Sequence, residues 1–361
     1  MDLRDFRSHT KQSLEIGDSL TVIAGPNGSG KTNLLEALHF GLTGRSCRTA
    51  MDRQVIAWEA STAFVEIDWD EEDGAKHVLR TALDRSGEKK IRLDDSALDQ
   101  ALPSTKRPAA IVFLPDRLSL VTGTPGERRK HFDKLVSELD PYYAQTRSQY
   151  TEALVQRNAL LGRIRATGEV PTSLEAWDQR LAELGSQVVS KRDGVVASIN
   201  ESLAETAKSL GLNGHLELRH RPGGANTDSE YLSELAEKMD SDLERGFTSY
   251  GPHRAEFVFW REGHAIKTTG SQGEKRMSLL ALLLTERELL TARTGSTPVL
   301  LLDDVMSELD ASRRRLLVER VSGAGQCVIT ATEFEHVPVD GVSGVATVPI
   351  GGIPAPNLKA A

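Results

Sequence analysis

The spacing of apolar residues along the chain changes from strand-like to helix-like and back again. An apolar run at residues 20–23 stops at a glycine-rich loop and is followed by the helical pattern of NLLEALHF. This order predicts a strand, a loop and a helix. Within residues 63–93, alternating segments separated by turn-forming residues predict an antiparallel sheet. The apolar segment AAIVFLPD predicts a further strand.

A helical pattern extends over about residues 127–245. Apolar side chains recur at steps of three and four residues, first over residues 132–143 and then with heptad spacing over residues 174–188. The segment TGEVP between these runs predicts a turn. We therefore expect either a short antiparallel helical arm or an ordinary helical bundle. Gly185 and Gly194 interrupt the second helical pattern and argue against a long coiled coil.

Strand character returns after residue 246 in the segment AEFVFW. The loop TTGSQGE then leads into the helical segment KRMSLLALLLTERELL, and the apolar strand PVLLLDD follows. Both ends of the chain therefore carry strands, and the helical pattern lies between them.

Composition narrows the class of protein. The 361 residues include 44 basic and 52 acidic side chains, and the formal net charge of -8 confines any nucleic-acid site to local clusters. The longest apolar run is too short to cross a membrane, and the amino terminus has no apolar core of a secretion signal. The two cysteines, Cys47 and Cys327, are far apart and suit a reducing compartment. We expect a cytoplasmic protein.

The glycine-rich loop carries the most specific chemistry. It matches G-x-x-x-x-G-K-[ST] without deviation, between an apolar strand and an amphipathic helix. Its glycines allow backbone N–H groups to point at phosphate oxygens, and the helix adds its positive end. Lys31 is expected to reach the β- and γ-phosphates of ATP, and Thr32 to offer its hydroxyl to Mg²⁺. The predicted ATP-binding residues are Gly25, Pro26, Asn27, Gly28, Ser29, Gly30, Lys31, Thr32 and Asn33.

Two adjacent carboxylates end the apolar strand at residues 299–302. Buried leucines followed by Asp303 and Asp304 are costly unless a cation or a polar site receives the charge. We expect Asp303 to hold Mg²⁺ together with Thr32, either as a direct ligand or through a group that is itself bound to the metal. Asp304 is the predicted catalytic carboxylate, which orients and polarises the attacking water while Lys31 holds the phosphates.

Two further segments narrow the class to ATPases of the ABC type. Ser271, Gln272 and Gly273 begin a segment that resembles the signature S-x-G-E/Q, at the start of a predicted helix whose positive end suits a γ-phosphate. The segment SELD, which ends at Asp310, resembles the D-loop. In ABC-type ATPases these segments face the ATP of the opposing subunit. The resemblance therefore implies an ATP-dependent head-to-tail homodimer.

These motifs predict the fold class and the domain organisation. We expect an α/β fold, namely an ABC-type P-loop ATPase head with a mixed or antiparallel β subdomain and an inserted helical arm. Residues 1–123 and 246–361 form the predicted head, and residues 124–245 the inserted helical domain.

Almost the whole chain resembles the RecF family. The resemblance is carried by LRDFRSH, GPNGSGKTNLLEAL, TGRSCRT, FLPDRLSLVTGTPGERRKHFD, QRNALL, SYGPHRAEF, GSQGEKR and LLLDDVMSELDASRRR. Of these, TGRSCRT, ERRKHFD and YGPHR are not general features of ABC-type ATPases. They distinguish the family from transporter ATPases, and the insertion is too short for the arm of an SMC protein.

The resemblance implies an ATP-dependent dimer that binds single- and double-stranded DNA at gaps or junctions and helps to place RecA recombinase there with RecO and RecR. A slow, DNA-stimulated ATPase acting as a switch is expected, because Thr330 and Thr332 stand where transporter ATPases carry a switch histidine. Because the chain begins close to LRDFRSH, we expect that the first strand of this family is shortened or that its start is misassigned, and a nucleotide contact from Arg7 is left unassigned. The alternatives are the ATPase subunit of a membrane transporter and a scaffold that binds ATP without hydrolysing it.

Basic clusters are the candidates for local DNA contact. The strongest candidate lies at the start of the helical region and comprises Arg128, Arg129 and Lys130. A second candidate comprises Lys89, Lys90 and Arg92. Each cluster also fits an ordinary solvated face, and the first also fits a contact to RecR.

Overall fold

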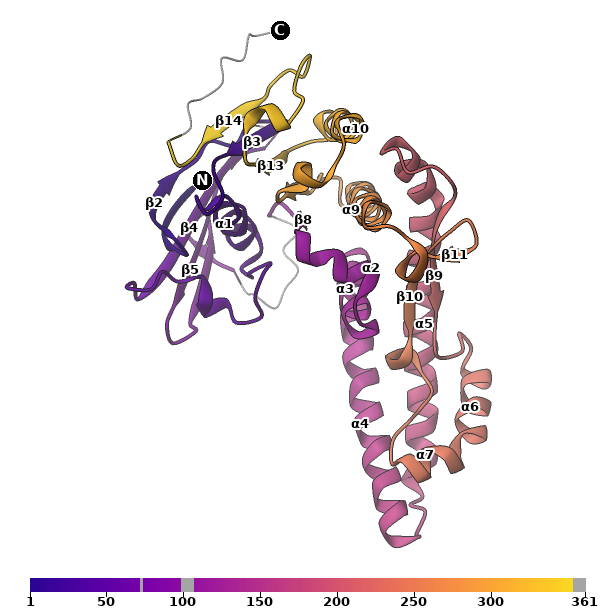
Figure 1. Ribbon diagram of the computed structural model, residues 1–361. Coiled ribbons are helices and arrows are strands. Elements are labelled where there is room, and N and C mark those ends of the chain that lie inside the picture. Colours follow the sequence, from indigo (N-terminus) through magenta and orange to yellow (C-terminus); the bar gives the residue numbers. More distant parts are fainter. Residues whose placement is uncertain (72–73, 99–106, 353–361) are drawn as a thin grey trace. The chain divides into compact units, whose positions relative to one another are not determined.

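The computed structural model describes residues 1–71, 74–98 and 107–352 (Figure 1). The chain forms two compact units, each with its own apolar core. The first unit consists of Met1–Arg117, Ser209–Gly211 and Arg287–Ala361, and the second of Leu118–Lys208 and Leu212–Glu286.

An antiparallel sheet of six strands lies in the first unit. Its strands are β1 (Asp2–Phe6), β2 (His9–Ser13), β4 (Thr62–Asp70), β5 (Lys76–Asp84), β6 (Lys89–Leu93) and β7 (Ser96–Ala97). They follow the order β2-β1-β4-β5-β6-β7. Buried and more exposed residues alternate along β4 and β5, because successive side chains point to opposite faces of a sheet. The predicted antiparallel sheet is confirmed, and β1 joins it to the start of the chain.

A parallel sheet of five strands forms the other layer of the first unit. Its strands are β3 (Leu20–Ala24), β8 (Ala110–Phe113), β12 (Val299–Leu302), β13 (Cys327–Ala331) and β14 (Ala346–Pro349), in the order β14-β3-β13-β12-β8. Every residue of β3, β12 and β13 is buried, as is typical of central parallel strands. Since β13 lies between β3 and β12, the carboxyl ends of these three strands meet at one edge of the sheet.

Helix α1 (Lys31–Thr43) contacts strands of both sheets, and this explains why it is buried on nearly all sides. It ends at Gly44, whose left-handed conformation (φ 72°) closes the last turn onto Phe40. Helix α10 (Ala311–Ser322) also belongs to this unit. Short 3-10 helices occupy Asp52–Val55, Pro115–Leu118, Val305–Glu308 and Phe334–His336.

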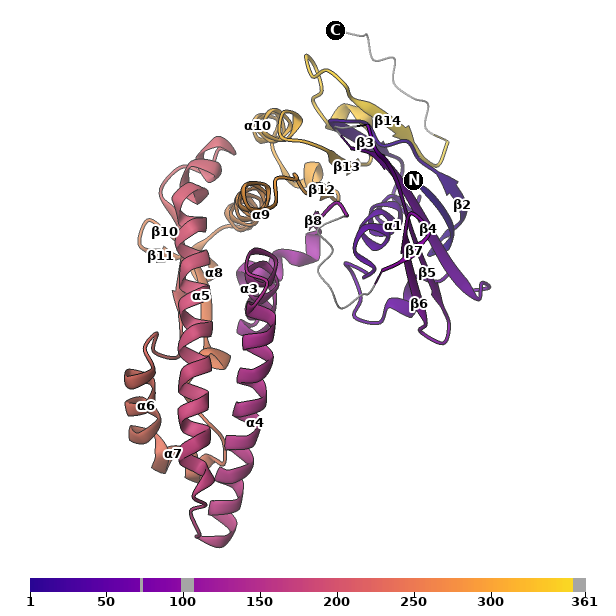
Figure 2. The ribbon, with the colours of Figure 1, turned by 180° about the vertical axis from the view of Figure 1, so that it is seen from behind.

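The second unit is mainly helical. Its helices are α2 (Ser119–Thr122), α3 (Pro125–Leu139), α4 (Tyr143–Thr167), α5 (Ser173–Ser209), α6 (Asp228–Glu237), α7 (Met239–Arg245), α8 (Ile266–Thr269) and the first part of α9 (Gln272–Thr294). A turn at Gly168 (φ 73°) joins α4 to α5. The two helices run side by side in opposite directions (Figures 1 and 2), which confirms the antiparallel arm.

Helix α5 continues through Gly185 instead of breaking there. A Cβ atom at Gly185 would lie 2.5 Å from the ring of Tyr231, so the glycine makes room for a core tyrosine of α6. Tyr231 is fully buried and belongs to the apolar cluster of the arm together with Leu181 and Leu235. The glycine therefore serves close packing.

The expectation of an unbroken helical pattern over residues 127–245 is wrong at β9 (Leu216–Arg221). This strand pairs antiparallel with β10 (Glu256–Arg261), which also pairs with β11 (His264–Ala265). Leu216 and Leu218 are buried, and the residue between them is not, so the segment has the two-residue period of a strand. The strand forms because its partner, about forty residues further along, supplies the hydrogen bonds.

The second compact unit extends beyond the predicted inserted domain on both sides. It begins at Leu118 and reaches Glu286, because β10, β11 and the start of α9 pack with the helices of this unit. A compact unit is not the same as a domain, and the division at residues 124 and 245 stays a prediction. Within the described ranges, no helix is long and apolar enough to cross a membrane.

Candidate functional site

The glycine-rich loop joins β3 to α1 at the carboxyl edge of the parallel sheet. Gly28 (φ 82°) and Gly30 (φ 95°) adopt left-handed conformations that other residues rarely adopt. A Cβ atom on Gly30 would lie 2.5 Å from the ring of His9, whose Nε2 donates to the Gly30 carbonyl at 3.1 Å. The start of the chain therefore touches the loop, and Gly30 is required by both conformation and space.

Lys31 is the first residue of α1 and is only 8% exposed. Its Nζ donates to the carbonyl oxygens of Gly25 at 2.7 Å and Pro26 at 3.0 Å. Burial lowers the pKa of Lys31, while the nearby Asp304 and Asp303 act in the opposite direction. The ammonium group is thus held inside the loop, next to two carboxylates.

Three elements converge on the Asp303 carboxylate. The Thr32 hydroxyl at the start of α1 donates to both carboxylate oxygens at 2.9 Å. The Thr330 hydroxyl of β13 donates to Oδ1 at 2.7 Å and accepts a bond from the backbone N–H of Asp304 at 2.9 Å. Thr32 and Asp303, which the sequence predicts as the metal pair, are therefore in direct contact.

Burial raises the pKa of Asp303, against the hydrogen bonds from Thr330 and Thr32. The carboxylate is 5% exposed, and a cation beside it would remove this penalty. The oxygen atoms of Thr32 and Asp303 are the kind of ligand that Mg²⁺ prefers. Ser29 Oγ in the same loop is buried without a hydrogen-bond partner among the described residues. These residues fit a bound metal and a phosphate group.

Asp304 follows Asp303 in a left-handed conformation (φ 46°), which is unusual for a residue other than glycine. Its carboxylate accepts a hydrogen bond from the Ser307 hydroxyl at 3.1 Å. The unusual backbone turns the chain sharply after β12, so two successive carboxylates share one edge of the sheet. Strained backbone of this kind is often found at functional sites.

No role was predicted for several residues around the loop. Glu36 of α1 is fully buried, and its carboxylate accepts two bonds from Arg7, at 2.9 and 2.8 Å. Arg48 donates to Asn33 at 3.1 Å and lies near enough to Asp303 to lower the pKa of that carboxyl. The signal for Arg48 was the family-specific segment TGRSCRT, to which no role was given. Arg7 is therefore tied to a carboxylate of α1.

The signature residues lie in the second unit, at the start of α9. The Ser271 hydroxyl accepts from the Glu274 N–H at 3.2 Å, and the Ser271 N–H donates to the Glu274 carboxylate at 2.7 Å. This reciprocal capping fixes the segment that includes Gln272 and Gly273. The backbone bond from Ser271 lowers the pKa of Glu274, and Arg261 pairs with the same carboxylate. Contact with ATP of another subunit stays a prediction.

Asp310 of the predicted D-loop has a structural role within its own subunit. Its carboxylate caps α10 by accepting a bond from the Arg313 N–H at 2.9 Å. Its other oxygen lies 3.7 Å from the Arg313 Nε, and the side chain is 60% exposed. Contact with the nucleotide of an opposing subunit stays a prediction.

The predicted DNA cluster of Arg128, Arg129 and Lys130 does not form one basic surface. Arg128 is 2% exposed, and its guanidinium pairs with Glu256 at 2.7 Å. Arg129 donates to the backbone carbonyl of Ala255 at 2.8 Å. Only Lys130 is exposed. The prediction is wrong for Arg128, because its charge is neutralised by a carboxylate far along the chain and is unavailable to phosphates.

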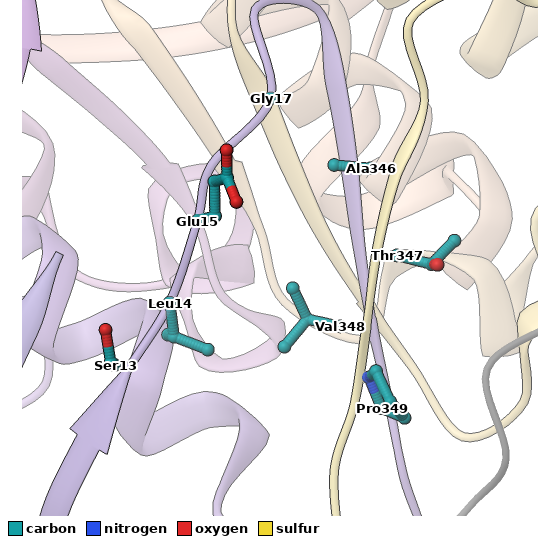
Figure 3. Close-up of a pocket in the computed structure, with 8 residues that line it drawn as sticks. All are labelled: Ser13, Leu14, Glu15, Gly17, Ala346, Thr347, Val348 and Pro349. Carbon is teal, nitrogen blue, oxygen red and sulfur yellow. The ribbon is translucent and has the colours of Figure 1, made fainter.

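A separate pocket of about 310 Å³ lies elsewhere in the first unit (Figure 3). It opens between the segment that follows β2 and the edge strand β14, and the side chains of Leu14 and Val348 point into it from opposite sides. Its eight lining residues include none of the phosphate-loop residues, Asp303 or Asp304. It is therefore not the predicted nucleotide site.

Comparison with known proteins defines the class first. The family model "RecF/RecN/SMC N terminal domain" matches residues 1–347. A solved Smc head bound to the C-winged helix domain of ScpA has a TM-score of 0.53 and 16% identity, covering 93% of this chain and 89% of its own, and shows the likeness of fold. The fold and the site thus define an ATPase head of the RecF/RecN/SMC class.

More similar proteins narrow this class. The "DNA replication and repair protein RecF" of Chlorobium phaeobacteroides (strain BS1) is 32% identical over 359 residues, covering 97% of this chain and 98% of the relative. A solved structure described as the recombination mediator protein RecF-ATP in the RecFOR pathway has a TM-score of 0.82 and 29% identity, covering 97% and 94% of the two chains. The chain belongs to the RecF family. Membership of this family argues against the alternative prediction, the ATPase subunit of a membrane transporter.

Proposed function

We propose that this chain is an ATP-dependent DNA-binding ATPase of recombinational gap repair. The observation that carries the proposal is the convergence of Lys31, Thr32 and Asp303 at one edge of the parallel sheet in a RecF-family chain. The similar solved structure contains ATP and is placed in the RecFOR pathway by its own description. We infer binding at single-strand gaps or junctions and help in loading RecA, with RecO and RecR as cytoplasmic partners.

The phosphates of ATP would replace the contacts that Lys31 now makes. Its Nζ bonds two carbonyl oxygens of its own loop, and phosphate oxygens are stronger acceptors for an ammonium group. The backbone N–H groups of the loop and the start of α1 would bind the same anion. Nucleotide binding would therefore exchange the acceptors of Lys31.

Thr32 and Asp303 would hold Mg²⁺, with the Thr330 bond keeping the carboxylate in place. When bound, Mg²⁺ neutralises charge on the β- and γ-phosphate oxygens. Asp304 would accept a hydrogen bond from the attacking water and orient it toward the γ-phosphate. Slow turnover follows, because Thr330 and Thr332 cannot act as the imidazole of a switch histidine.

The signature segment would complete the site of a second subunit. Ser271 and Gly273 stand at the positive end of the long helix α9, where an anion is favoured. ATP would therefore join two subunits head to tail, with the signature segment and Asp310 of one facing the nucleotide of the other. DNA would stimulate hydrolysis by favouring this dimer.

The test measures ATP hydrolysis and DNA binding of the purified full chain with a gapped duplex, a blunt duplex and no DNA. We expect slow hydrolysis that gapped DNA accelerates, and tighter binding of gapped DNA with ATP. The salt concentration must be fixed, since phosphate contacts depend on it. ATP binding without hydrolysis would favour the scaffold instead, and no ATP-dependent binding to gapped DNA would overturn the proposal.

A further inference from the structure

The outer face of the antiparallel sheet carries a row of basic residues. On β4 and β5, residues such as Val65 and Leu79 are buried toward α1, and the residues between them face the other way. The cross-strand register places the row on this outer face. In strand order from β2 to β6 it consists of Lys11, Arg4, Phe64, Ala82 and Lys90.

This basic row crosses five strands. Neighbouring strands are about 4.8 Å apart, so the row is about 19 Å long. Its cations are exposed, whereas Phe64 and Ala82 are half-buried at the centre. The row thus offers positive charge at both ends and an apolar middle.

Two cations of the row repel each other, and the contacts within the fold do not offset this repulsion. Arg4 and Lys11 are directly opposite each other on β1 and β2, and like charges in this position are destabilising. Within the described ranges, neither side chain has an ion-pair or hydrogen-bond partner. Among the described residues, Lys90 has an exposed pair with Glu88 at 3.1 Å. An anion bound along the row would remove the repulsion.

The neighbouring row on the same face is different. There, Glu66 stands between Asp2 and Arg80, and Arg80 pairs with Glu66 and with Asp95. Other carboxylates of this face, Asp68, Asp70 and Asp84, lie in further rows, and ligand atoms of Asp2, Glu66 and Asp68 lie within 4.8 Å of one another. The basic row itself contains no carboxylate, and the pair from Lys90 reaches Glu88 in the preceding turn.

An exposed aromatic side chain lies in the loop that leads into β4, the strand that carries Phe64. Trp58 is 95% exposed, in the loop that precedes β4. Arg85 holds this loop by donating to the carbonyls of Ala57 at 2.9 Å, Trp58 at 2.6 Å and Ala60 at 2.9 Å. Phe64 is two residues past the start of β4, which is about 7 Å along the strand. An exposed tryptophan on a braced loop is suited to stacking.

We propose that the basic row and Trp58 form a binding surface for single-stranded DNA, with phosphates on Arg4, Lys11 and Lys90 and bases stacked on Trp58 and Phe64. Cations interleaved with aromatic rings on an open sheet are how many proteins hold single strands. A duplex would contact the cations, but its paired bases cannot reach the rings. The inference rests on the proposed function and locates the single-stranded part of the gap.

The first test replaces the like-charged pair with Arg4→Thr and Lys11→Thr together. Binding of a labelled single-stranded oligonucleotide should weaken, and the slope of log K against log salt should flatten by about 1.4 for two lost contacts. The thermal midpoint should stay equal or rise, because the repulsion is removed. Lys76→Thr is the control, since Lys76 is 81% exposed on the same sheet beside Asp70. Unchanged affinity and slope, or a loss of binding together with stability, would overturn the proposal.

The second test separates stacking from charge. Trp58→Ala should weaken single-strand binding about 10-fold, and Trp58→Phe should recover most of it, because a ring is restored. Blunt-duplex binding should not change with either variant. An equal loss on single-stranded and duplex DNA, or no loss on either, counts against the surface. If wild-type protein binds gapped DNA with ATP while these variants match it, only this inference fails and the proposed function survives.

Discussion

Lys31 is held by two carbonyl oxygens of its own loop, so its charge is in place before any phosphate arrives. Such preorganisation lowers the cost of ordering a long side chain on binding. Burial lowers the pKa of Lys31 but Asp303 and Asp304 oppose this, and a phosphate would oppose it further. The Lys31 ammonium group can therefore exchange the two carbonyl oxygens for phosphate oxygens and keep its charge.

Lys31→Ala should weaken ATP binding by about 10- to 100-fold, the worth of a hydrogen bond to a charged group. Calorimetric titration with a slowly hydrolysed ATP analogue measures this directly. Lys134→Ala serves as the control, since Lys134 is an exposed lysine of α3. Nucleotide affinity equal to wild type would refute the assignment of the loop.

Asp303 and Asp304 are adjacent but differ in their surroundings. Asp303 is enclosed by two threonine hydroxyls, whereas Asp304 bonds one serine. Asp304→Asn should therefore leave ATP binding intact and slow hydrolysis by about 10²-fold or more, because the water loses its polarising carboxylate. Steady-state turnover measured beside nucleotide affinity decides this. A wild-type rate in Asp304→Asn, or an equal fall in ATP affinity, contradicts the assigned role.

At the level of elements, the segment YGPHR is explained by packing in the second unit. His253 Nε2 must donate to the carbonyl of Thr248 at 3.0 Å, since a carbonyl only accepts. In the neutral ring, Nδ1 then accepts from the Tyr150 hydroxyl at 2.7 Å. Arg192 donates to the carbonyl of Pro252 at 2.7 Å and to Asp133. The segment thus ties α4 and α5 together.

Burial lowers the pKa of His253 to about 4, from an ordinary value of 6.5. Between these values the unfolded chain binds the proton that the folded chain excludes, so stability is present above pH 6.5 and is lost as pH falls toward 4. We expect a loss of about 2 kcal/mol in the free energy of unfolding between pH 7 and pH 5 from this group.

Chemical denaturation at both pH values measures this loss. His253→Gln should be less stable at pH 7 but should show a smaller difference between the two pH values. His264→Gln is the control, because His264 is exposed on β11. The same pH dependence in wild type and in His253→Gln would show that another group is responsible.

Motifs that are local in sequence were predictable, and contacts between distant segments were not. The phosphate loop and the aspartate pair follow from short strings whose chemistry requires their spacing. Thr330 gains its role only when β13 lies between β3 and β12, an order that no local pattern contains. Arg128 looked like a phosphate contact because Glu256, its partner, is 128 residues away. Strand β9 was not predicted because its partner, β10, is also distant in the sequence.

At the level of the whole molecule, the predicted ATP-dependent dimer depends on Ser271. This side chain already caps α9 through Glu274, so a substitution there can affect both folding and assembly. A pair of variants separates the two effects. Ser271→Arg removes the cap and adds bulk, whereas Ser271→Asp keeps a capping oxygen and only adds negative charge.

Both variants should bind ATP as monomers and fail to dimerise, because either bulk or like charge would oppose the γ-phosphate of the second subunit. Sedimentation with and without ATP measures the association, and the thermal midpoint measures the fold. Ser271→Asp should keep a thermal midpoint near that of wild type. Ser271→Arg should have a lower midpoint, because loss of the helix cap lowers the free energy of unfolding by about 1 kcal/mol. Ser296→Arg, in the exposed loop after α9, controls for added charge. A normal ATP-dependent dimer of Ser271→Asp would rule out the signature segment as the site that receives the opposing nucleotide.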